Sequence, residues 1–171
     1  MQSLLEPISK RLPPMLKETL KVRGMALFKV PMLFFASPTV IELTDRRCVV
    51  KLPLNRRTRN HLGSMYFGAL SVGADCAGAL IAWRLGENQP RRISLIFKDF
   101  HAEFLKRAEG DVYFTCDDGE VIQRAVDQTA ATGERLNLPV NVVATVPSKL
   151  GDEPVARFIL TLSLKPAKQA K

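Results

Sequence analysis

The chain has 171 residues, of which 46% are hydrophobic and 25% are charged. This ordinary composition argues against extensive disorder, and the length suits one domain that buries about two-thirds of its unfolded surface. We therefore treat residues 1–171 as a single domain that ends in a flexible tail at 166–171. The net charge of +8 indicates either an anionic partner or simply a basic surface in contact with solvent.

The cysteines and histidines argue against a metal site. Cys48, Cys76 and Cys116 lack CxxC spacing and lie in apolar runs, which is typical of free buried thiols in a reducing compartment. Neither His61 nor His101 has a second histidine or cysteine at ligand spacing, so we predict no metal and no cofactor. Charged residues interrupt the apolar N-terminal stretch, which argues against a signal peptide. We expect a cytoplasmic protein.

The N-terminal residues 1–36 are expected to form a helical segment. Apolar side chains recur at spacings of three and four over residues 4–20, which predicts an amphipathic helix with a soft break at Pro13 and Pro14. Residues 28–36 are apolar but interrupted by proline, so we expect an irregular or one-turn helical piece there.

Strand-like runs follow on both sides of a long apolar segment. Residues 38–44 and 48–54 flank a hairpin turn at 45–47. Four later runs also have strand character: residues 92–104, 110–116, 135–146 and 156–165. The second of these follows the first within hairpin distance, and a turn-rich link predicts that the last two are antiparallel neighbours.

Between the second and third of those later runs, residues 119–132 predict a short helix that ends at Gly133. Helices therefore do not alternate with single strands, which disfavours a doubly wound parallel sheet. The element order instead predicts an α+β fold, in which a curved antiparallel sheet of five to six strands wraps around one long central helix.

That central helix is predicted from residues 65–85, which are apolar on nearly every side. Such a helix is either buried all round or crosses a membrane. Asp75 lies at its middle, where a charge would cost about 2.5–3.5 kcal/mol in a bilayer. Because the flanking chain also has the pattern of a sheet, we predict a buried helix and no membrane span.

Asp75 is the strongest single clue to function. A carboxylate in apolar surroundings is costly unless it is hydrogen-bonded or used in catalysis. Desolvation should raise its pKa, a common condition for a general base. The alternative is a structural carboxylate that bonds a neighbouring loop or a dimer mate.

The segment just before the helix offers groups that complement such an acid. Free N–H groups and the positive end of the helix dipole stabilise an oxyanion, and Asn60 supplies a side-chain donor. Arg56, Arg57 and Arg59 form a basic cluster that suits phosphate, although a solvated loop explains each of them equally well. The Lys/Arg clusters lack interleaved aromatic residues, so we expect no nucleic-acid partner.

The spacing in this region resembles that of hotdog-fold proteins of the PaaI-like thioesterase group, particularly the DUF4442 branch. The pattern is Asn, two residues, Gly, two residues, His-Gly-Gly, and an acid nine residues after that His. The corresponding positions in this sequence are Asn60, Gly63, residues 66–68 and Asp75. The resemblance in organisation spans roughly residues 38–165 and implies a hotdog fold.

The resemblance also implies roles for these residues. Asp75 would be the general base or nucleophile, and the backbone N–H of Phe67 or Gly68 would polarise the thioester carbonyl. Asn60 would reach across the interface of a homodimer, or of a dimer of dimers, to orient the acid or water. Gly63 and Tyr66, together with the arginine cluster, would contact substrate.

Two residues depart from the pattern, because Tyr66 replaces the usual His and Phe67 replaces the first Gly. The side chain of Phe67 would crowd the approach of the thioester, which affects turnover more than binding. The leading hypothesis is a thioesterase acting on an acyl-CoA or an acyl carrier protein. The alternative is a hotdog protein that binds an acyl-CoA or lipid without catalysis.

Overall fold

The computed structural model describes residues 15–90 and 92–167. Most of the predicted helix at 4–20 therefore lies outside the described residues, as does most of the predicted tail. Pro166, which was expected to start that tail, is instead the last residue of a strand.

The helices and strands follow one another along the chain. Their order is α2 (Leu16–Lys29), α3 (Pro31–Ala36), β1 (Thr39–Leu43), β2 (Cys48–Leu52), α4 (Phe67–Glu87), β3 (Ile93–Phe104), β4 (Val112–Cys116), α5 (Gly119–Thr132), β5 (Leu136–Thr145), α6 (Pro147–Leu150) and β6 (Pro154–Pro166). The predicted helix that ends at Gly133 is confirmed, with φ of +71° at that glycine. The segment at 28–36 is more helical than expected, since α2 runs to Lys29 and Pro31 starts α3, where proline is well tolerated.

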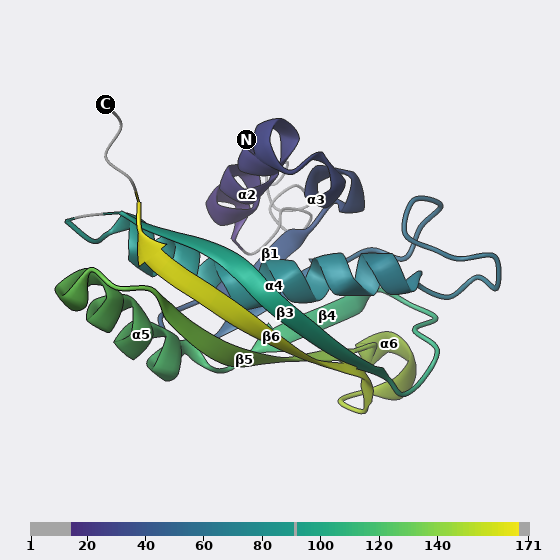
Figure 1. Cartoon of the computed structure of the whole chain (residues 1–171). Helices are drawn as coiled ribbons and strands as arrows, with labels where there is room; N and C mark the ends of the chain where they lie inside the picture. Colours follow the sequence, from purple (N-terminus) through teal and green to yellow (C-terminus); the bar gives the residue numbers. More distant parts are fainter. Residues whose placement is uncertain (1–14, 91, 168–171) are drawn as a thin grey trace, which may run out of the picture.

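The six strands form one antiparallel sheet in the order β1-β2-β4-β5-β6-β3, and α4 lies across it (Figure 1). The predicted α+β architecture, with one long central helix and an N-terminal helix, is confirmed. The hairpin of β1 with β2 and the pairing of β5 with β6 also match the sequence-based expectation. The long strand β3 ends up at the edge of the sheet.

The expected proximity of β3 and β4 is wrong. β4 pairs with β2 and β5, whereas β3 pairs with β6 at the far edge. The link between β3 and β4 is anchored to other segments, because the N–H groups of Leu105 and Lys106 both donate to the carbonyl oxygen of Val155, at 2.9 and 3.1 Å. These bonds carry the link across the end of the sheet and prevent a hairpin turn.

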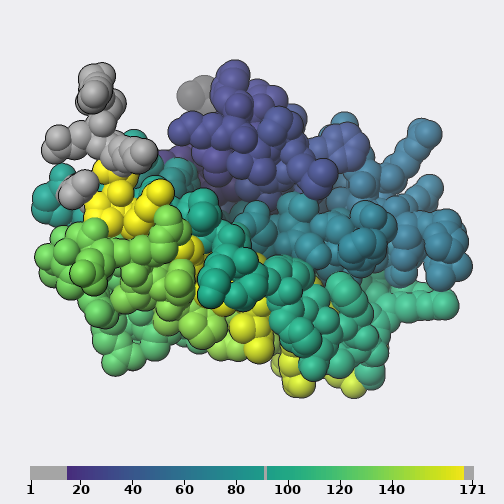
Figure 2. Space-filling view, in the orientation of Figure 1, coloured from purple at the N-terminus to yellow at the C-terminus, as the bar shows by residue number. Residues whose placement is uncertain are grey.

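Small residues on α4 let the sheet approach the helix backbone closely. A Cβ added at Gly73 would lie 2.3 Å from the ring of Phe114, which is fully buried in β4. On the other side of α4 from most of the sheet, α2 and α3 form an additional layer (Figure 1), visible as a raised mass in Figure 2. The central helix is therefore enclosed between a sheet and a helical layer.

Within residues 15–90 and 92–167, no helix is both long and apolar enough to cross a membrane. The three cysteines are buried and free, as the apolar runs around them predicted. Burial raises the pKa of the Cys116 thiol to about 11, which keeps it protonated and unreactive at neutral pH.

Candidate functional site

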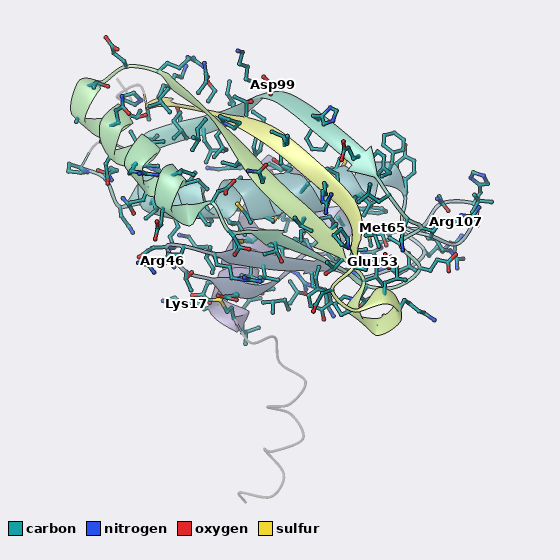
Figure 3. The ribbon with its side chains drawn as sticks, turned by 90° about the horizontal axis from the view of Figure 1, so that it is seen from below. Lys17, Arg46, Met65, Asp99, Arg107 and Glu153 are labelled. Carbon is teal, nitrogen blue, oxygen red and sulfur yellow. The ribbon has the colours of Figure 1, made fainter. Side chains whose placement is uncertain are left out.

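A pocket of about 490 Å³ opens beside the first turn of α4, and we call it the helix-start pocket. It is lined by Asn60, His61, Ser64, Met65, Tyr66, Phe67, Leu70, Phe104, Leu105, Lys106, Arg107 and Ala108. Figure 3 shows Met65 and Arg107 at the same end of the molecule, with Asp99 further back along β3. The pocket therefore lies where the loop before α4 meets the end of β3.

Asn60 shapes the loop that forms one wall of this pocket. Its Oδ1 accepts the N–H of Leu62 at 2.9 Å, and its Nδ2 donates to Oγ of Ser64 at 3.1 Å. Gly63 adopts φ of +82°, a conformation that favours glycine in a tight turn. The N–H of Met65 donates to the carbonyl oxygen of Ala108 at 2.8 Å, which ties the loop to the link after β3.

The first turn of α4 presents backbone donors next to the pocket. The N–H of Tyr66 donates to Thr58 O at 2.8 Å, and that of Leu70 donates to Tyr66 O at 3.0 Å. The N–H groups of the three residues between them have no acceptor within the helix, as at every helix start. The residues concerned are Phe67, Gly68 and Ala69. Such donors can polarise a carbonyl oxygen or hold an oxyanion.

Aromatic rings build the apolar side of the pocket. The ring of Tyr66 folds over Gly68, where a Cβ would lie only 2.5 Å from it. The ring centroids of Tyr66 and Phe67 are 4.7 Å apart, and those of Phe67 and Phe104 are 6.4 Å apart. Because Phe67 is 58% exposed, its side chain forms a wall of the pocket and leaves the cavity open.

A second pocket, of about 270 Å³, contains the central acid, and we call it the Asp75 pocket. It is lined by Val22, Met25, Lys29, Val30, Leu33, Asp75, Cys76, Ala79, Leu80, Trp83, Glu87, Arg92 and Leu95. Side chains from α2 and α3 cover one side of it, α4 forms the other side, and the start of β3 closes it. Its surface is mainly apolar, with a few charged groups.

The carboxyl group of Asp75 is half-buried in this pocket. Burial raises its pKa from 3.8 to about 6. No described residue forms an ion pair or a side-chain hydrogen bond with it, so among those residues no partner offsets the desolvation. A carboxyl group with a pKa near neutrality can take and release a proton at physiological pH.

Within one chain, the acid and the backbone donors lie too far apart to act together. Asp75 follows Phe67 by eight residues, which corresponds to about 12 Å along a helix. An oxyanion donor must lie about 3 Å from the carbonyl oxygen, and a general base must lie about 3 Å from the water that attacks the same carbonyl. The structure thus brings Asn60, Tyr66 and Phe67 together at one pocket and leaves Asp75 in another. Gly63 does not line either pocket, and its part is to turn the loop that carries Asn60.

The predicted arginine cluster lines neither pocket, and its members are exposed. Arg57 instead lies over the ring of Phe35, 5.2 Å from its centroid. The basic residues at the helix-start pocket are Lys106 and Arg107. They lie there because the hydrogen bond from the N–H of Met65 to Ala108 O holds the link after β3 against the loop before α4. No local motif marks them, because only the long-range path of the chain brings them to α4.

Metal chemistry has no obvious location in the described chain. Across residues 15–90 and 92–167, no group of three or more His, Cys, Asp or Glu side chains is placed to hold a metal ion.

Several solved structures are similar to this chain. The structural-genomics protein APC5556 is 28% identical over 85% of this chain and 88% of its own, with a TM-score of 0.66. A Pseudomonas aeruginosa protein of unknown function, described as a probable thioesterase, is 20% identical over 91% of this chain and 99% of its own, with a TM-score of 0.68. A thioesterase candidate from Shewanella oneidensis is 15% identical over 88% and 99%, with a TM-score of 0.73.

At these identities, the two thioesterase-like structures establish the fold alone. No curated protein matches the chain. A family model described as a domain of unknown function, DUF4442, matches residues 19–162. The chain therefore belongs to the DUF4442 family and has the thioesterase-like hotdog fold.

Proposed function

We propose that the protein is a thioesterase that hydrolyses an acyl-CoA or acyl carrier protein thioester at a site shared between two subunits. The observation that carries the proposal is Asp75, a desolvated carboxyl group with a pKa of about 6, lying in a pocket on the same helix that presents free N–H groups at its start. The likeness to thioesterase-like structures supports the reaction class.

The chemistry needs one base and one oxyanion donor. The carboxylate of Asp75 takes a proton from water as the water oxygen attacks the thioester carbonyl. The carbonyl oxygen gains negative charge, which the N–H groups of Phe67 and Gly68 stabilise. The carbon–sulfur bond then breaks, the thiol leaves with the proton, and the free acid is released. Direct attack by the carboxylate, followed by hydrolysis of the anhydride, would use the same groups.

Pairing between subunits at β3 would bring the two halves of the site together. The strand is twelve residues long, and its outer edge has no partner among the described residues. A long open edge is a template for another strand. Phe100 and Phe104 on it are 42% and 50% exposed, which is typical of a surface that becomes buried in an assembly.

The direction of α4 relative to β3 explains why such pairing would place the acid of one subunit near the backbone donors of the other. The helix starts near the end of β3, where Phe67 meets Phe104, and it ends near the start of β3, where a Cβ on Gly86 would lie 3.1 Å from the Cβ of Ile93. Two β3 edges paired antiparallel would set the helix start of one subunit beside the later part of the partner's helix. Asp75 of one subunit would then face the helix-start pocket of the other. A dimer of dimers would keep this arrangement.

The basic residues at the helix-start pocket would contact the phosphates of CoA. Lys106 and Arg107 lie there in place of the arginine cluster at 56–59, and guanidinium groups bind phosphate well. Asn60 and Gly63 would hold the loop, and Tyr66 would contact the substrate. The buried free thiols favour a reducing compartment, so we place the reaction in the cytoplasm.

A second candidate function is binding of an acyl-CoA or lipid without hydrolysis. The aromatic wall at the helix-start pocket favours it, because Phe67 and Tyr66 stand where the resembled family carries Gly and His. Calorimetry that detects acyl-CoA binding, together with an absence of thiol release, would select this function over hydrolysis.

The main test is thiol release from short-chain, long-chain and aromatic acyl-CoAs by the wild-type protein and by Asp75→Asn. We expect release by the wild type and a loss of about 10²–10⁴-fold in kcat for the variant. The rate should also rise with pH through about 6, as the carboxyl group of Asp75 ionises. A wild-type protein that releases no thiol from any of these substrates would end the hydrolase proposal.

Mixing two inactive variants tests the shared site. In Asp75→Asn homodimers every site lacks the acid, and in Asn60→Ala homodimers every site lacks the oriented loop. After subunit exchange, each heterodimer would hold one intact site, so activity should recover to about one quarter of the wild-type value. If Asp75 and Asn60 acted within one chain, no intact site could form and mixing would restore nothing.

A further inference from the structure

Several large apolar side chains are exposed on α2 and α3, and we call this set the N-terminal apolar patch. Its members are Leu20, Leu27, Phe28, Met32 and Phe35. Phe28 is 84% exposed, Met32 is 69% exposed and Leu20 is 60% exposed. Exposed apolar groups gathered on one surface usually mark an interaction site.

The distribution of apolar side chains on α2 is unusual for a surface helix. Its buried residues are the small or medium-sized Thr19, Val22 and Ala26. Its exposed side carries Leu20, Leu27 and Phe28. A surface helix normally turns its larger apolar residues inward. Packing within the described chain does not account for these outward residues, so we attribute them to contact with something outside it.

The rim of the patch is positively charged. No acidic residue occurs between positions 19 and 41 of the sequence. Lys29, next to Phe28, is exposed, although it also lines the Asp75 pocket, and Arg57 lies over the ring of Phe35 at 5.2 Å. Exposed aromatic and aliphatic groups beside Lys and Arg are the combination found on surfaces that bind at a membrane interface.

We propose that the N-terminal apolar patch docks the protein onto an anionic lipid bilayer surface. Phe28, Met32 and Phe35 enter the boundary between headgroups and acyl chains, while Lys29 and Arg57 contact lipid phosphates. Two signals of this kind, apolar insertion and basic charge, together give reversible peripheral binding. This docking differs from spanning the membrane, and it does not depend on the proposed hydrolysis.

Charge favours the bilayer over a second copy of the chain. Each chain has a net charge of +8, and two such patches facing each other would bring their cationic rims together. An anionic lipid surface instead attracts the same rim. The patch also lies on the helical layer over α4, which forms a raised surface that a flat bilayer can reach (Figure 2).

The position of the patch links it to the Asp75 pocket. Val22, Met25 and Leu33, on the inner side of the same two helices, line that pocket. A bilayer on the outer side and a mainly apolar pocket on the inner side are thus separated by a single layer of helix. If the proposed hydrolysis holds, this arrangement suits acyl chains long enough to partition into membranes.

Vesicle sedimentation tests the docking. The wild-type protein is mixed with vesicles of phosphatidylcholine alone or with about 30% phosphatidylglycerol, at low and high salt. We expect sedimentation with the anionic vesicles, weakened by salt, and little with the neutral ones. The double variant Phe28→Ser, Met32→Ser should bind at least about tenfold more weakly. The matched control Ile159→Ser changes a side chain that is 44% exposed on β6 and should bind like the wild type.

A conservative variant provides a second measurement that does not remove apolar surface. Phe28→Trp should be quenched by brominated lipids in anionic vesicles, beyond the quenching of Trp83 in the wild type. Three results would overturn the proposal: no binding to anionic vesicles, equal binding by the double variant, or no added quenching at position 28. A change in molar mass with the double variant, without vesicle binding, would show that the patch serves a second copy instead.

Discussion

The two pockets on α4 differ in what they contain and in how they are built. The helix-start pocket is formed by a loop held by hydrogen bonds and by the end of β3, and it offers backbone N–H groups, aromatic rings and two basic side chains. The Asp75 pocket is formed by packed helices, and it offers a desolvated acid. Neither pocket alone contains both an oxyanion donor and a base.

This difference separates a half-buried acid from the open pocket at the start of the same helix. The Asp75 pocket raises the pKa of the acid through burial, whereas the helix-start pocket stays open and polar enough to receive a charged substrate.

The largest expected effect on stability comes from the desolvation of Asp75. The folded-state pKa of Asp75, about 6, lies above its ordinary value of 3.8, so the folded protein binds this proton more tightly than the unfolded chain does. The free energy of unfolding should therefore fall as pH rises from about 4 to about 6 and stay lower above that range. Asp75→Asn removes this loss and should raise the stability by about 1–3 kcal/mol at pH 8.

Urea denaturation of the wild type and of Asp75→Asn at pH 4 and pH 8 measures this difference. The pH-dependent contributions of all other groups to the free energy of unfolding are the same in the two proteins and cancel. At pH 4 the two proteins should be nearly equally stable. A variant that is less stable than the wild type at pH 8 would indicate that Asp75 makes a favourable structural contact, which would weaken the contrast between the pockets.

The next effect concerns Gly73, which lies between the two pockets on α4. Gly73→Ala places a methyl group 2.3 Å from the buried ring of Phe114, and we expect a net destabilisation of about 2 kcal/mol despite the better helix propensity of alanine. Gly24→Ala is the matched control on α2, because an added Cβ there would have nothing within 4 Å. Its free energy of unfolding should rise by up to about 1 kcal/mol. Thermal unfolding distinguishes the two. Equal shifts would mean that the α4–sheet contact is looser than the structure indicates.

The smallest effect tests the helix-start pocket alone. Arg107→Ala should raise KM for acyl-CoA by about three- to tenfold, or about 1 kcal/mol, and leave the stability unchanged because the side chain is exposed. An acyl-pantetheine substrate, which lacks the nucleotide phosphates, should show no change. Arg157→Ala, an exposed arginine on β6 outside both pockets, serves as the control. An equal effect on both substrates would show that Arg107 does not bind the nucleotide phosphates of CoA.

Local patterns in the sequence predict most of the fold. The apolar run around Asp75, the turn at 45–47 and the glycine after α5 each act within a few residues, and each was predictable from the sequence. The pairing of β3 with β6 was not, because it depends on hydrogen bonds from Leu105 and Lys106 to Val155, about fifty residues away.

The candidate site was predictable only in part, for the same reason. Asn60, Phe67 and Asp75 are neighbours in sequence, so a motif can mark them. Their distance along α4 follows from that spacing. The enclosure of Asp75 in a pocket of its own depends on α2 and α3, which cover one side of α4, and no periodicity within α4 indicates that cover. Lys106 and Arg107 lie at the helix start because Met65 contacts Ala108, and this contact joins segments more than forty residues apart in the sequence.

That contact also joins two walls of the helix-start pocket. The buried N–H of Met65 is held by the carbonyl oxygen of Ala108, so the loop and the link can separate only when this bond breaks. In hydrogen-exchange experiments, the Met65 amide is therefore protected while the pocket keeps its shape and exchanges when the loop opens. A single amide thus reports on opening of the pocket without a bound ligand.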